Sequence, residues 1–385
     1  MKLGIFTTHP IQYHVPLWRV LSKSKNLEVK VFYFSDVSIR GGLDPDFGVK
    51  LKWDIPLLEG YEYEFITKDA DLSKPGKLLI TELDKLFLKE KFDWMLIQGY
   101  TYGFERQIIK AKSKFKYRIC IRGEFTNMPR DNSIVKKNFK KIYLRWFYKH
   151  IDSYCYIGQE AYEHLKSKNI KENILFFSPY AIDDELFQKQ IEKFKRMESR
   201  QELGIKDNDI ALLFSGKFIP RKMPMLLAEA IEMLNKKENV FLIMLGDGEL
   251  KDEVERKLRP LLNDKLIMPG FVNQSSLGYY FCAADIFILP SNYETWGLVV
   301  NEAMQFGLPV IVSDKVGCKK DLVIPCKTGY IFPNNDATEL SSMIEKLIEN
   351  PGLIYTLGQE AKRLISKYSI NNAINGILEA IDINE

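Results

Sequence analysis

The sequence has no apolar run long enough to cross a bilayer, and it has few cysteines. None of its 385 residues lies in a stretch approaching the ~18 to 20 consecutive apolar residues that a membrane-spanning helix needs. The five cysteines are scattered without CxxC spacing, which argues against a disulfide framework and favours reduced, buried thiols. The first residues lack the apolar stretch and small-residue cleavage site of a signal peptide. These absences predict a cytoplasmic protein.

A large net charge is also lacking, although charge of one sign accumulates locally. The formal net charge is +4, yet the stretch from Lys110 to Lys149 holds 13 Lys and Arg residues against Glu124 and Asp131. The remainder of the chain is mildly acidic. A local basic field favours one specific anionic partner over general nucleic-acid binding, and we expect no nucleic-acid partner.

The composition and the hydrophobic pattern predict an α/β protein. Hydrophobic residues make up 46% of the chain, which excludes wholesale disorder. Short β-branched and aromatic runs alternate with helical patterns, giving seven expected strands between residues 2 and 177 and six between 210 and 332. Many runs are apolar throughout, as in parallel strands covered by helices on both faces. We therefore expect two Rossmann-like, doubly wound parallel-sheet domains, 1–182 and 183–367, and a last helix in 368–385 that crosses back to the first domain.

The densest chemical signal is the stretch DIFILPSNYETWGLVVNE, which begins at Asp285. A hydrophobic strand ends at Pro290, and a helix opens near Gly297. The carboxyl end of a strand next to a helix amino terminus is the ligand position in open α/β sheets, and backbone N–H groups there attract anions. Glu294 and Glu302 can accept hydrogen bonds from sugar hydroxyls. The alternative is a helix with two solvated glutamates.

A second signal is FSGKFIPRKMP, in which a strand ends at Gly216. Lys217 and Lys222 then lie close to the start of the next helix. Two ammonium groups beside a helix amino terminus can clamp a diphosphate, whereas the alternative is a solvated basic turn.

Two further strand ends carry GDGEL, which starts at Gly246, and the residues Phe271 and Val272. GDGEL is not GxGxxG because Lys251 takes the third glycine position, so nicotinamide chemistry loses its main support. Asn273 and Gln274 could meet a nucleobase edge.

Together these four elements resemble the retaining glycosyltransferases of family 4, which have the GT-B fold. The likeness is strong over about 205–345 and weak elsewhere. Glu294 and Glu302 match the family's E-x7-E motif, and Lys217 and Lys222 match its R-x4-K motif with lysine in place of arginine. That exchange keeps the charge but loses bidentate geometry.

The resemblance implies two domains that face a cleft and a nucleoside-diphosphate sugar held by the second domain. Lys217 and Lys222 would stabilise the departing diphosphate, Glu302 would bind the ribose and Glu294 the donor sugar. No cofactor and no metal is implied. The implied donor-binding residues are Gly216, Lys217, Lys222, Gly246, Phe271, Val272, Glu294, Thr295, Gly297, Leu298, Val299 and Glu302, of which Glu294, Lys217 and Lys222 are the expected catalytic residues.

The first domain would bind the acceptor, and here the chain departs from the family pattern. Many members carry a histidine after a first-domain strand, whereas this chain has Arg122, Gly123 and Glu124 after the matching strand. The expected acceptor-binding residues are His9, Gln12, His14, Arg122 and Glu124. For His14, structural packing is an equally open interpretation.

The segment Ile134–His150 interleaves lysines with aromatic and aliphatic residues at helical spacing. This pattern is typical of a helix that lies on an anionic membrane surface. The pattern is also that of a domain helix whose apolar face enters the core and whose lysines are solvated, and this interpretation is favoured because the next segment is a core strand and one apolar face cannot serve both partners. We expect a cytoplasmic enzyme that can bind peripherally to the inner face of the membrane.

These observations favour a retaining glycosyltransferase that uses a UDP-sugar rather than a GDP-sugar. Its acceptor would be a glycan, or be lipid-linked or protein-linked, in surface polysaccharide or glycoconjugate synthesis of the bacterial type. The alternatives are a GT-B sugar-nucleotide epimerase or phosphorylase, and a non-catalytic scaffold subunit that binds sugar nucleotides.

Overall fold

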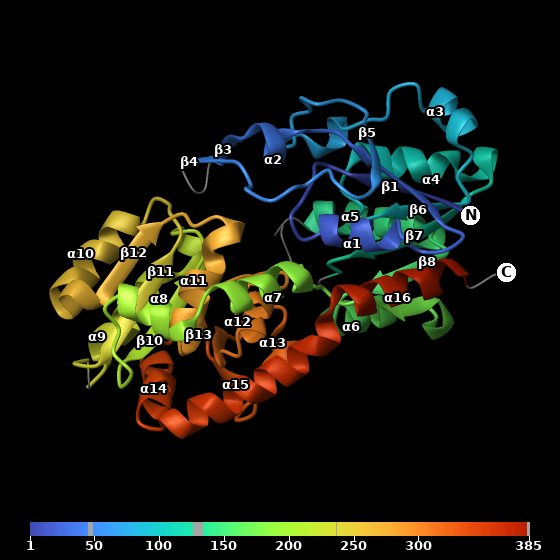
Figure 1. Ribbon diagram of the computed structural model, residues 1–385. Coiled ribbons are helices and arrows are strands. Elements are labelled where there is room, and N and C mark those ends of the chain that lie inside the picture. Colours follow the sequence, from blue (N-terminus) through green and yellow to red (C-terminus); the bar gives the residue numbers. More distant parts are fainter. Residues whose placement is uncertain (45–48, 126–133, 236, 383–385) are drawn as a thin grey trace. The chain divides into compact units, whose positions relative to one another are not determined.

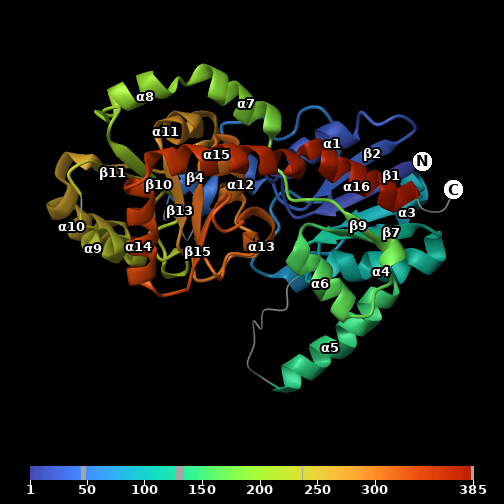
Figure 2. The ribbon, with the colours of Figure 1, turned by 90° about the horizontal axis from the view of Figure 1, so that it is seen from below.

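The structure is a computed structural model that describes residues 1–44, 49–125, 134–235 and 237–382. The chain forms two compact units (Figures 1 and 2). The first unit comprises Met1–Gly41, Pro56–Tyr180 and Ile370–Glu385, and the second comprises Gly42–Ile55 and Ala181–Ser369. The second unit therefore takes up a short segment from the first half of the sequence, and the first unit takes up the last helix.

The first unit is built on a seven-stranded parallel sheet with strand order β5-β2-β1-β6-β7-β8-β9. Its strands are β1 Lys2–Thr7, β2 Glu28–Tyr33, β5 Glu62–Phe65, β6 Trp94–Ile97, β7 Arg118–Gly123, β8 Ser153–Tyr156 and β9 Leu175–Phe177. Its helices are α1 Val15–Leu21, α2 Val37–Arg40, α3 Leu83–Glu90, α4 Gly103–Phe115, α5 Ile134–Lys149, α6 Gln159–Ser167 and α16 Ile370–Asp382. The central strands β1, β6 and β7 are largely buried on both faces, and β6 is apolar throughout, as the continuous hydrophobic runs predict.

Helix α16 packs tightly against the far edge of the first sheet. A Cβ atom at Gly376 would lie 2.0 Å from the Phe177 carbonyl oxygen, so only glycine permits this approach. The Ser178 hydroxyl donates to the Ala373 carbonyl over 2.7 Å. The last helix is thus an integral part of the first unit.

The second unit is built on a six-stranded parallel sheet with strand order β12-β11-β10-β13-β14-β15. Its strands are β10 Ile210–Ser215, β11 Val240–Leu245, β12 Leu266–Gly270, β13 Ile286–Leu289, β14 Val310–Ser313 and β15 Gly329–Phe332. Its helices are α7 Asp184–Lys193, α8 Arg196–Glu202, α9 Pro224–Met233, α10 Lys251–Leu262, α11 Leu277–Ala283, α12 Leu298–Gln305, α13 Lys319–Leu322, α14 Ala337–Ile348 and α15 Pro351–Ile365. A small antiparallel pair, β3 Gly42–Asp44 and β4 Val49–Leu51, also clusters with this unit.

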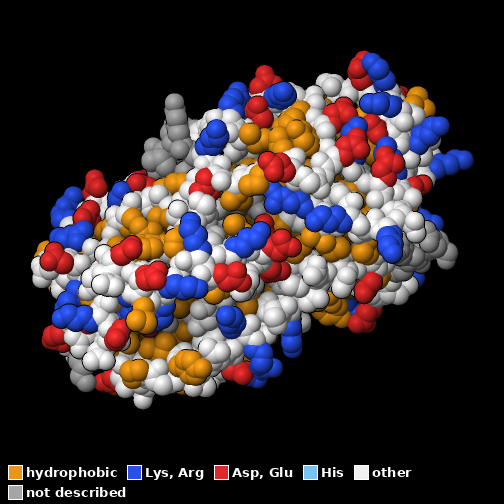
Figure 3. Space-filling model, viewed as in Figure 1, with side chains coloured by type: hydrophobic (Ala, Val, Ile, Leu, Met, Phe, Trp, Pro, Cys, Tyr) orange, Lys and Arg blue, Asp and Glu red, His pale blue; other side chains and the backbone are white. Residues whose placement is uncertain are grey.

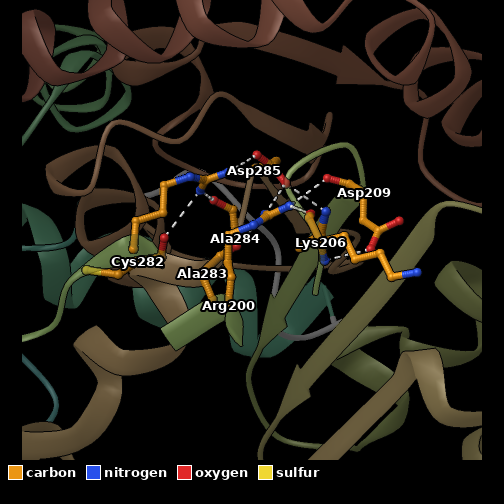
Figure 4. Close-up of polar contacts among 9 residues, drawn as sticks. Arg200, Lys206, Asp209, Cys282, Ala283, Ala284 and Asp285 are labelled. Atoms are coloured by element: carbon orange, nitrogen blue, oxygen red, sulfur yellow. Dashed lines mark hydrogen bonds and ion pairs between the residues drawn. The ribbon is translucent and has the colours of Figure 1, made fainter. Parts of the chain in front are cut away.

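The amino edge of the second sheet carries a buried ion-pair network (Figure 4). Arg200, only 3% exposed, pairs with Asp285 at 2.9 Å and donates to the carbonyls of Lys206 and Asp209 at 2.6 and 2.7 Å. The Asp285 carboxylate also accepts the Ala211 backbone N–H over 2.8 Å. These bonds fix α8 to the starts of β10 and β13.

Two further observations concern the distribution of charge on the surface and the apolar length of the helices. On the face in Figure 3, acidic and basic side chains are intermingled without a field of one sign. None of the helices within the described ranges is long and apolar enough to span a bilayer.

Candidate functional site

The carboxyl edge of the second sheet contains the point where the strand order reverses. From β10 the chain proceeds through β11 to β12 on one side, and then continues with β13 to β15 on the other. In doubly wound sheets the crevice at such a reversal is the ligand position. Lys217 follows β10 and Ser291 follows β13, so these two loops flank the reversal.

A row of glycines forms the neighbouring part of this edge. Gly216, Gly246 and Gly270 lie at the ends of the adjacent strands β10, β11 and β12. Gly246 donates its N–H to the Gly270 carbonyl over 2.8 Å, and a Cβ atom at Gly246 would lie 1.9 Å from the Gly216 carbonyl oxygen. Its φ of 132° is also a conformation that side chains rarely adopt. These glycines therefore let the strand ends pack closely together, and of the three only Gly216 is partly exposed.

Lys222 and Glu294 form an ion pair across the strand-order reversal. The sequence had assigned these two residues separate tasks. Lys222 ends the short helical turn Pro220–Lys222, and its aliphatic stem passes beside Gly216. The same Glu294 oxygen accepts the Ser291 hydroxyl over 2.9 Å, and Arg221 lies 3.8 Å from the other oxygen. The ammonium group of Lys222 is thus held at the reversal, and Lys217 lies half-buried at the end of β10.

The amino end of α12 completes this side of the edge. Gly297 precedes the helix with φ 100°, and a Cβ atom there would lie 3.1 Å from Val316. The N–H groups of Leu298 and Val299 are in the first helical turn and have no acceptor within the helix. Thr295, Gly297, Leu298 and Val299 are all half-buried. These N–H groups and the helix dipole make an anion-binding position beside Lys222.

The loop before α12 is held rigidly. Glu294 donates its N–H to the Lys315 carbonyl over 3.2 Å, and its own carbonyl accepts the Gly317 N–H over 3.1 Å. The Trp296 indole N–H donates to the Asn301 side chain over 2.9 Å. Glu302 lies on α12 with 2% exposure, compared with 7% for Glu294. The two glutamates of the motif are therefore both buried carboxyl groups on one preorganised element.

At the other end of the edge, Phe271 and Val272 follow β12 and are half-buried. The neighbouring amide that the sequence suggests for a nucleobase edge is already engaged. Asn273 accepts the N–H groups of Asp54 and Gln274 and donates to the Lys52 carbonyl. The Gln274 side chain is buried, with 5% exposure.

The first unit has a pocket of about 290 Å³ at the carboxyl ends of β1, β6 and β7. His14, Arg122 and Glu124, three of the five expected acceptor residues, line it. His9 and Gln12 are not among its lining residues, and the His9 ring contacts the Thr8 hydroxyl over 2.9 Å. Polar groups that sequence reasoning did not single out also line the pocket, namely Thr7, Thr8, Gln98, Glu105 and Tyr180.

Burial shifts the titratable groups of this pocket towards their neutral forms. Desolvation lowers the pKa of His14 to about 3, with a further lowering from the nearby charge of Arg122, and lowers that of His9 to about 4. Desolvation raises the pKa of Glu105 to about 8, against the opposing effect of the Tyr102 N–H that donates to it over 2.7 Å. The pocket therefore combines the neutral imidazole of His14 with a protonated carboxyl group at pH 7.

Arg122 is the one buried cation among the lining residues. Its side chain is 2% exposed and donates to the Ser178 hydroxyl at 2.8 Å and to the Pro179 carbonyl at 2.7 Å. The guanidinium carbon lies 5.3 Å from the centre of the Tyr180 ring, whose hydroxyl donates to Glu124 over 3.0 Å. Within the described ranges Arg122 forms no ion pair with a carboxylate, so its charge is available to an anionic group.

Glu105 could have been found from the sequence, although only as a capping residue. It is the third residue of α4, and its carboxyl group accepts the Tyr102 N–H in a capping box. A glutamate three residues after a helix start indicates a cap. Nothing in its spacing indicates that the same carboxyl group also lines a pocket.

Comparison with known proteins agrees with this geometry. Residues 195–367 match the family model "Glycosyl transferases group 1". An Escherichia coli protein, UDP-Gal:alpha-D-GlcNAc-diphosphoundecaprenol alpha-1,3-galactosyltransferase, is 30% identical over 212 residues, which cover 53% of this chain and 51% of that protein. The alpha-D-kanosaminyltransferase of Streptomyces kanamyceticus is 26% identical over 182 residues, or 46% of this chain and 47% of the relative. The chain thus spans about half the length of these curated relatives.

Solved structures match the whole chain in fold. HepE from Anabaena in complex with UDP aligns with a TM-score of 0.73 and 17% identity over 99% of this chain and 100% of the other. Sucrose-phosphate synthase from Thermosynechococcus elongatus aligns with a TM-score of 0.72 and 17% identity over 98% and 97%. The two parallel-sheet units and these likenesses confirm the expected GT-B fold.

Proposed function

We propose that the protein is a retaining glycosyltransferase that moves a sugar from a nucleoside-diphosphate sugar to a glycan, lipid-linked or protein-linked acceptor. The observation that carries the proposal is the anion-binding position at the strand-order reversal, where Lys222 meets the amino end of α12. The match of residues 195–367 to the glycosyltransferase group 1 model supports the reaction class.

The chemistry follows from where the cations lie. The bond between the anomeric carbon and the diphosphate oxygen breaks, and an acceptor hydroxyl forms the new bond on the same face of the sugar. The proton of that hydroxyl passes to the departing diphosphate. Lys217, Lys222 and the first-turn N–H groups of α12 stabilise the negative charge that develops on the leaving group. No step requires a metal ion or a cofactor.

The remaining donor contacts are distributed along the edge. Glu294 accepts hydrogen bonds from the sugar hydroxyls once Lys222 turns to the diphosphate, and Glu302 accepts those of the ribose. The glycine row allows the nucleotide to lie close to the backbone. UDP is favoured over GDP, because the HepE structure of the same fold holds UDP and the E. coli relative is named for a UDP-sugar donor.

The pocket of the first unit is the proposed acceptor site. It offers hydroxyl, amide and imidazole groups together with the buried cation of Arg122, which suits an acceptor that carries both hydroxyls and an anionic group. The diphosphate-linked acceptor in the name of the E. coli relative is of this class. A role in surface polysaccharide or glycoconjugate synthesis, at the cytoplasmic face of a membrane, would follow.

The test is a binding screen followed by product analysis. The full chain is heated with UDP- and GDP-sugars, since a ligand that binds the native state raises its melting temperature. The sugar that binds is then incubated with and without acceptor, and the anomeric configuration of the product is determined by NMR. A retained configuration in a product that needs acceptor is expected. Conversion of the donor alone would indicate an epimerase, and binding without turnover a scaffold; either result would overturn the proposal.

A further inference from the structure

Residues 52–54, called here the docked segment, are fixed to the loop that follows β12. The Asn273 side chain donates to the Lys52 carbonyl over 2.7 Å and accepts the Asp54 N–H over 3.3 Å. The Asp54 carboxylate accepts both the backbone N–H of Ser275, at 3.2 Å, and its hydroxyl. Four hydrogen bonds thus hold the docked segment at the start of the turn Gln274–Ser276.

These bonds bring an aromatic side chain to the end of β12. Trp53 lies between the two anchored residues, and its ring is 6.2 Å from that of Phe271 at an interplanar angle of 61°. Both rings are half-buried, so each keeps exposed surface beside its partner. They form an aromatic corner at the carboxyl edge of the second sheet.

The aromatic corner adjoins the glycine row. Phe271 follows Gly270 directly, and the Gly270 carbonyl accepts the N–H of Gly246 at the end of β11. Strands β12 and β10 lie two strand spacings apart, about 10 Å. A ribose and a base can therefore extend from a diphosphate beside Lys222 to this corner. The Asn273 amide is engaged by the docked segment. We therefore take the rings of Trp53 and Phe271, and not this amide, as the surface that recognises the base.

We propose that Trp53 binds the nucleobase of the donor by stacking, together with Phe271. The inference rests on the proposed function, because it takes the carboxyl edge of the second sheet as the nucleotide site. Every base has a π face, and stacking on an aromatic side chain tolerates both pyrimidines and purines. Asp54 and Asn273 are positioning residues that hold Trp53 in place.

The experiment measures the affinity of the full chain for UDP and GDP by calorimetry, which needs no turnover. Trp53→Ala should weaken nucleotide binding by about 5- to 100-fold, Trp53→Phe should retain most of it, and Asp54→Ala should weaken it by releasing the docked segment. The matched control is Tyr355→Ala, which removes a 70% exposed ring from α15 of the same unit. Circular dichroism and melting curves establish that each variant folds.

A second readout reports on the indole itself. Tryptophan fluorescence of the wild type should change when UDP binds, and the difference from Trp53→Phe gives the share of that change due to Trp53. Unaltered nucleotide affinity in folded Trp53→Ala would refute the inference but leave the proposed function intact. Failure of the wild type to bind either nucleotide would overturn both.

Discussion

The two sheets present chemically different carboxyl edges, although both are parallel and doubly wound. The edge of the second unit offers closely packed glycines, a helix amino terminus and lysine ammonium groups. The edge of the first unit encloses a small pocket in which His14 is held neutral and Glu105 is held protonated. One edge thus suits a ligand with fixed negative charge, and the other suits a polar ligand recognised by neutral hydrogen-bonding groups around a single cation.

The comparison shows that sheet topology determines where a site lies, whereas the side chains around it determine its chemistry. In both units the loops after the central strands line the site, as parallel sheets require. The glycines after β10 and β11 let the strand ends of the second edge pack closely, whereas Tyr180 and the amino end of α4 help to enclose the first. The predictions that follow test each edge against the other.

The largest effect is expected from Gly246→Ala, which would force apart the closely packed ends of β10 and β11. The new Cβ atom would lie 1.9 Å from the Gly216 carbonyl, at a φ of 132°. We expect a loss of about 3 kcal/mol in the free energy of unfolding, measured by chemical denaturation. Gly352→Ala is the control, because a Cβ atom there meets no atom within 4 Å. Equal stability of the two variants would contradict the packing described for the glycine row.

Lys222→Ala should reduce transfer by removing a charge-assisted contact to the departing diphosphate. The expected loss is about 1.5 to 3 kcal/mol of transition-state stabilisation, measured as kcat/KM with the donor identified by the binding screen. Arg221→Ala removes a neighbouring cation that is largely exposed, and it should have a clearly smaller effect. A Lys222→Ala enzyme with unchanged kcat and donor KM would remove Lys222 from the mechanism.

Glu105 should make the first unit sensitive to alkaline pH. Its carboxyl group stays protonated in the fold up to about pH 8, whereas the unfolded chain releases that proton near its ordinary pKa of 4.5. Stability must therefore fall as pH rises through this window. His9 and His14, whose pKa values are lowered, contribute the opposite slope only below their ordinary pKa of 6.5. From pH 6.5 to 8 the loss should reach about 2 kcal/mol.

The measurement compares melting curves of the wild type and Glu105→Gln at pH 6.5 and 8. Glutamine preserves a capping acceptor but cannot ionise. The melting temperature of Glu105→Gln should therefore be the same at pH 6.5 and at pH 8. Glu82→Gln, at a carboxylate that is 73% exposed, should behave as the wild type does. A wild type that is equally stable at both pH values would show that Glu105 ionises normally.

The smallest effect concerns the basic helix α5. Phe147 and Tyr148 are buried, which supports the domain-helix interpretation, yet Ile142 is 69% exposed beside Lys141 and Arg145. The side chains of 134–140, which carry the other lysines, lie outside the described part. Vesicles of anionic lipid should float with the protein at low salt, and Lys141→Ala should weaken binding by about fivefold, or ~1 kcal/mol. Absent or salt-insensitive binding would count against membrane association.

Much of the fold could be predicted from the hydrophobic pattern. Each of the thirteen apolar runs contains a strand, and they divide into sheets of seven and six. The runs are informative because strands such as β6 and β11 are buried on both faces and cannot carry polar residues. The pair β3 and β4 was missed, since strands of three residues each are too short to form such a run.

The site was predicted less completely, because pairing between distant residues leaves no local pattern. The sequence predicted that Lys217 and Lys222 follow the end of β10 and that Gly297 precedes a helix. The ion pair of Lys222 with Glu294 joins residues 72 apart, and the anchoring of Asp54 by Ser275 joins residues 221 apart. The ionisation state of Glu105 depends on how deeply α4 is packed, which no spacing reveals.

The incorporation of α16 into the first unit has a consequence for biosynthesis. A ribosome releases the strands of the first sheet long before it reaches Gly376, so that sheet must wait with its β8 and β9 flank uncovered while the whole second unit emerges and can fold. We expect nascent chains that stop before Ile370 to have a folded second unit and a protease-sensitive first one.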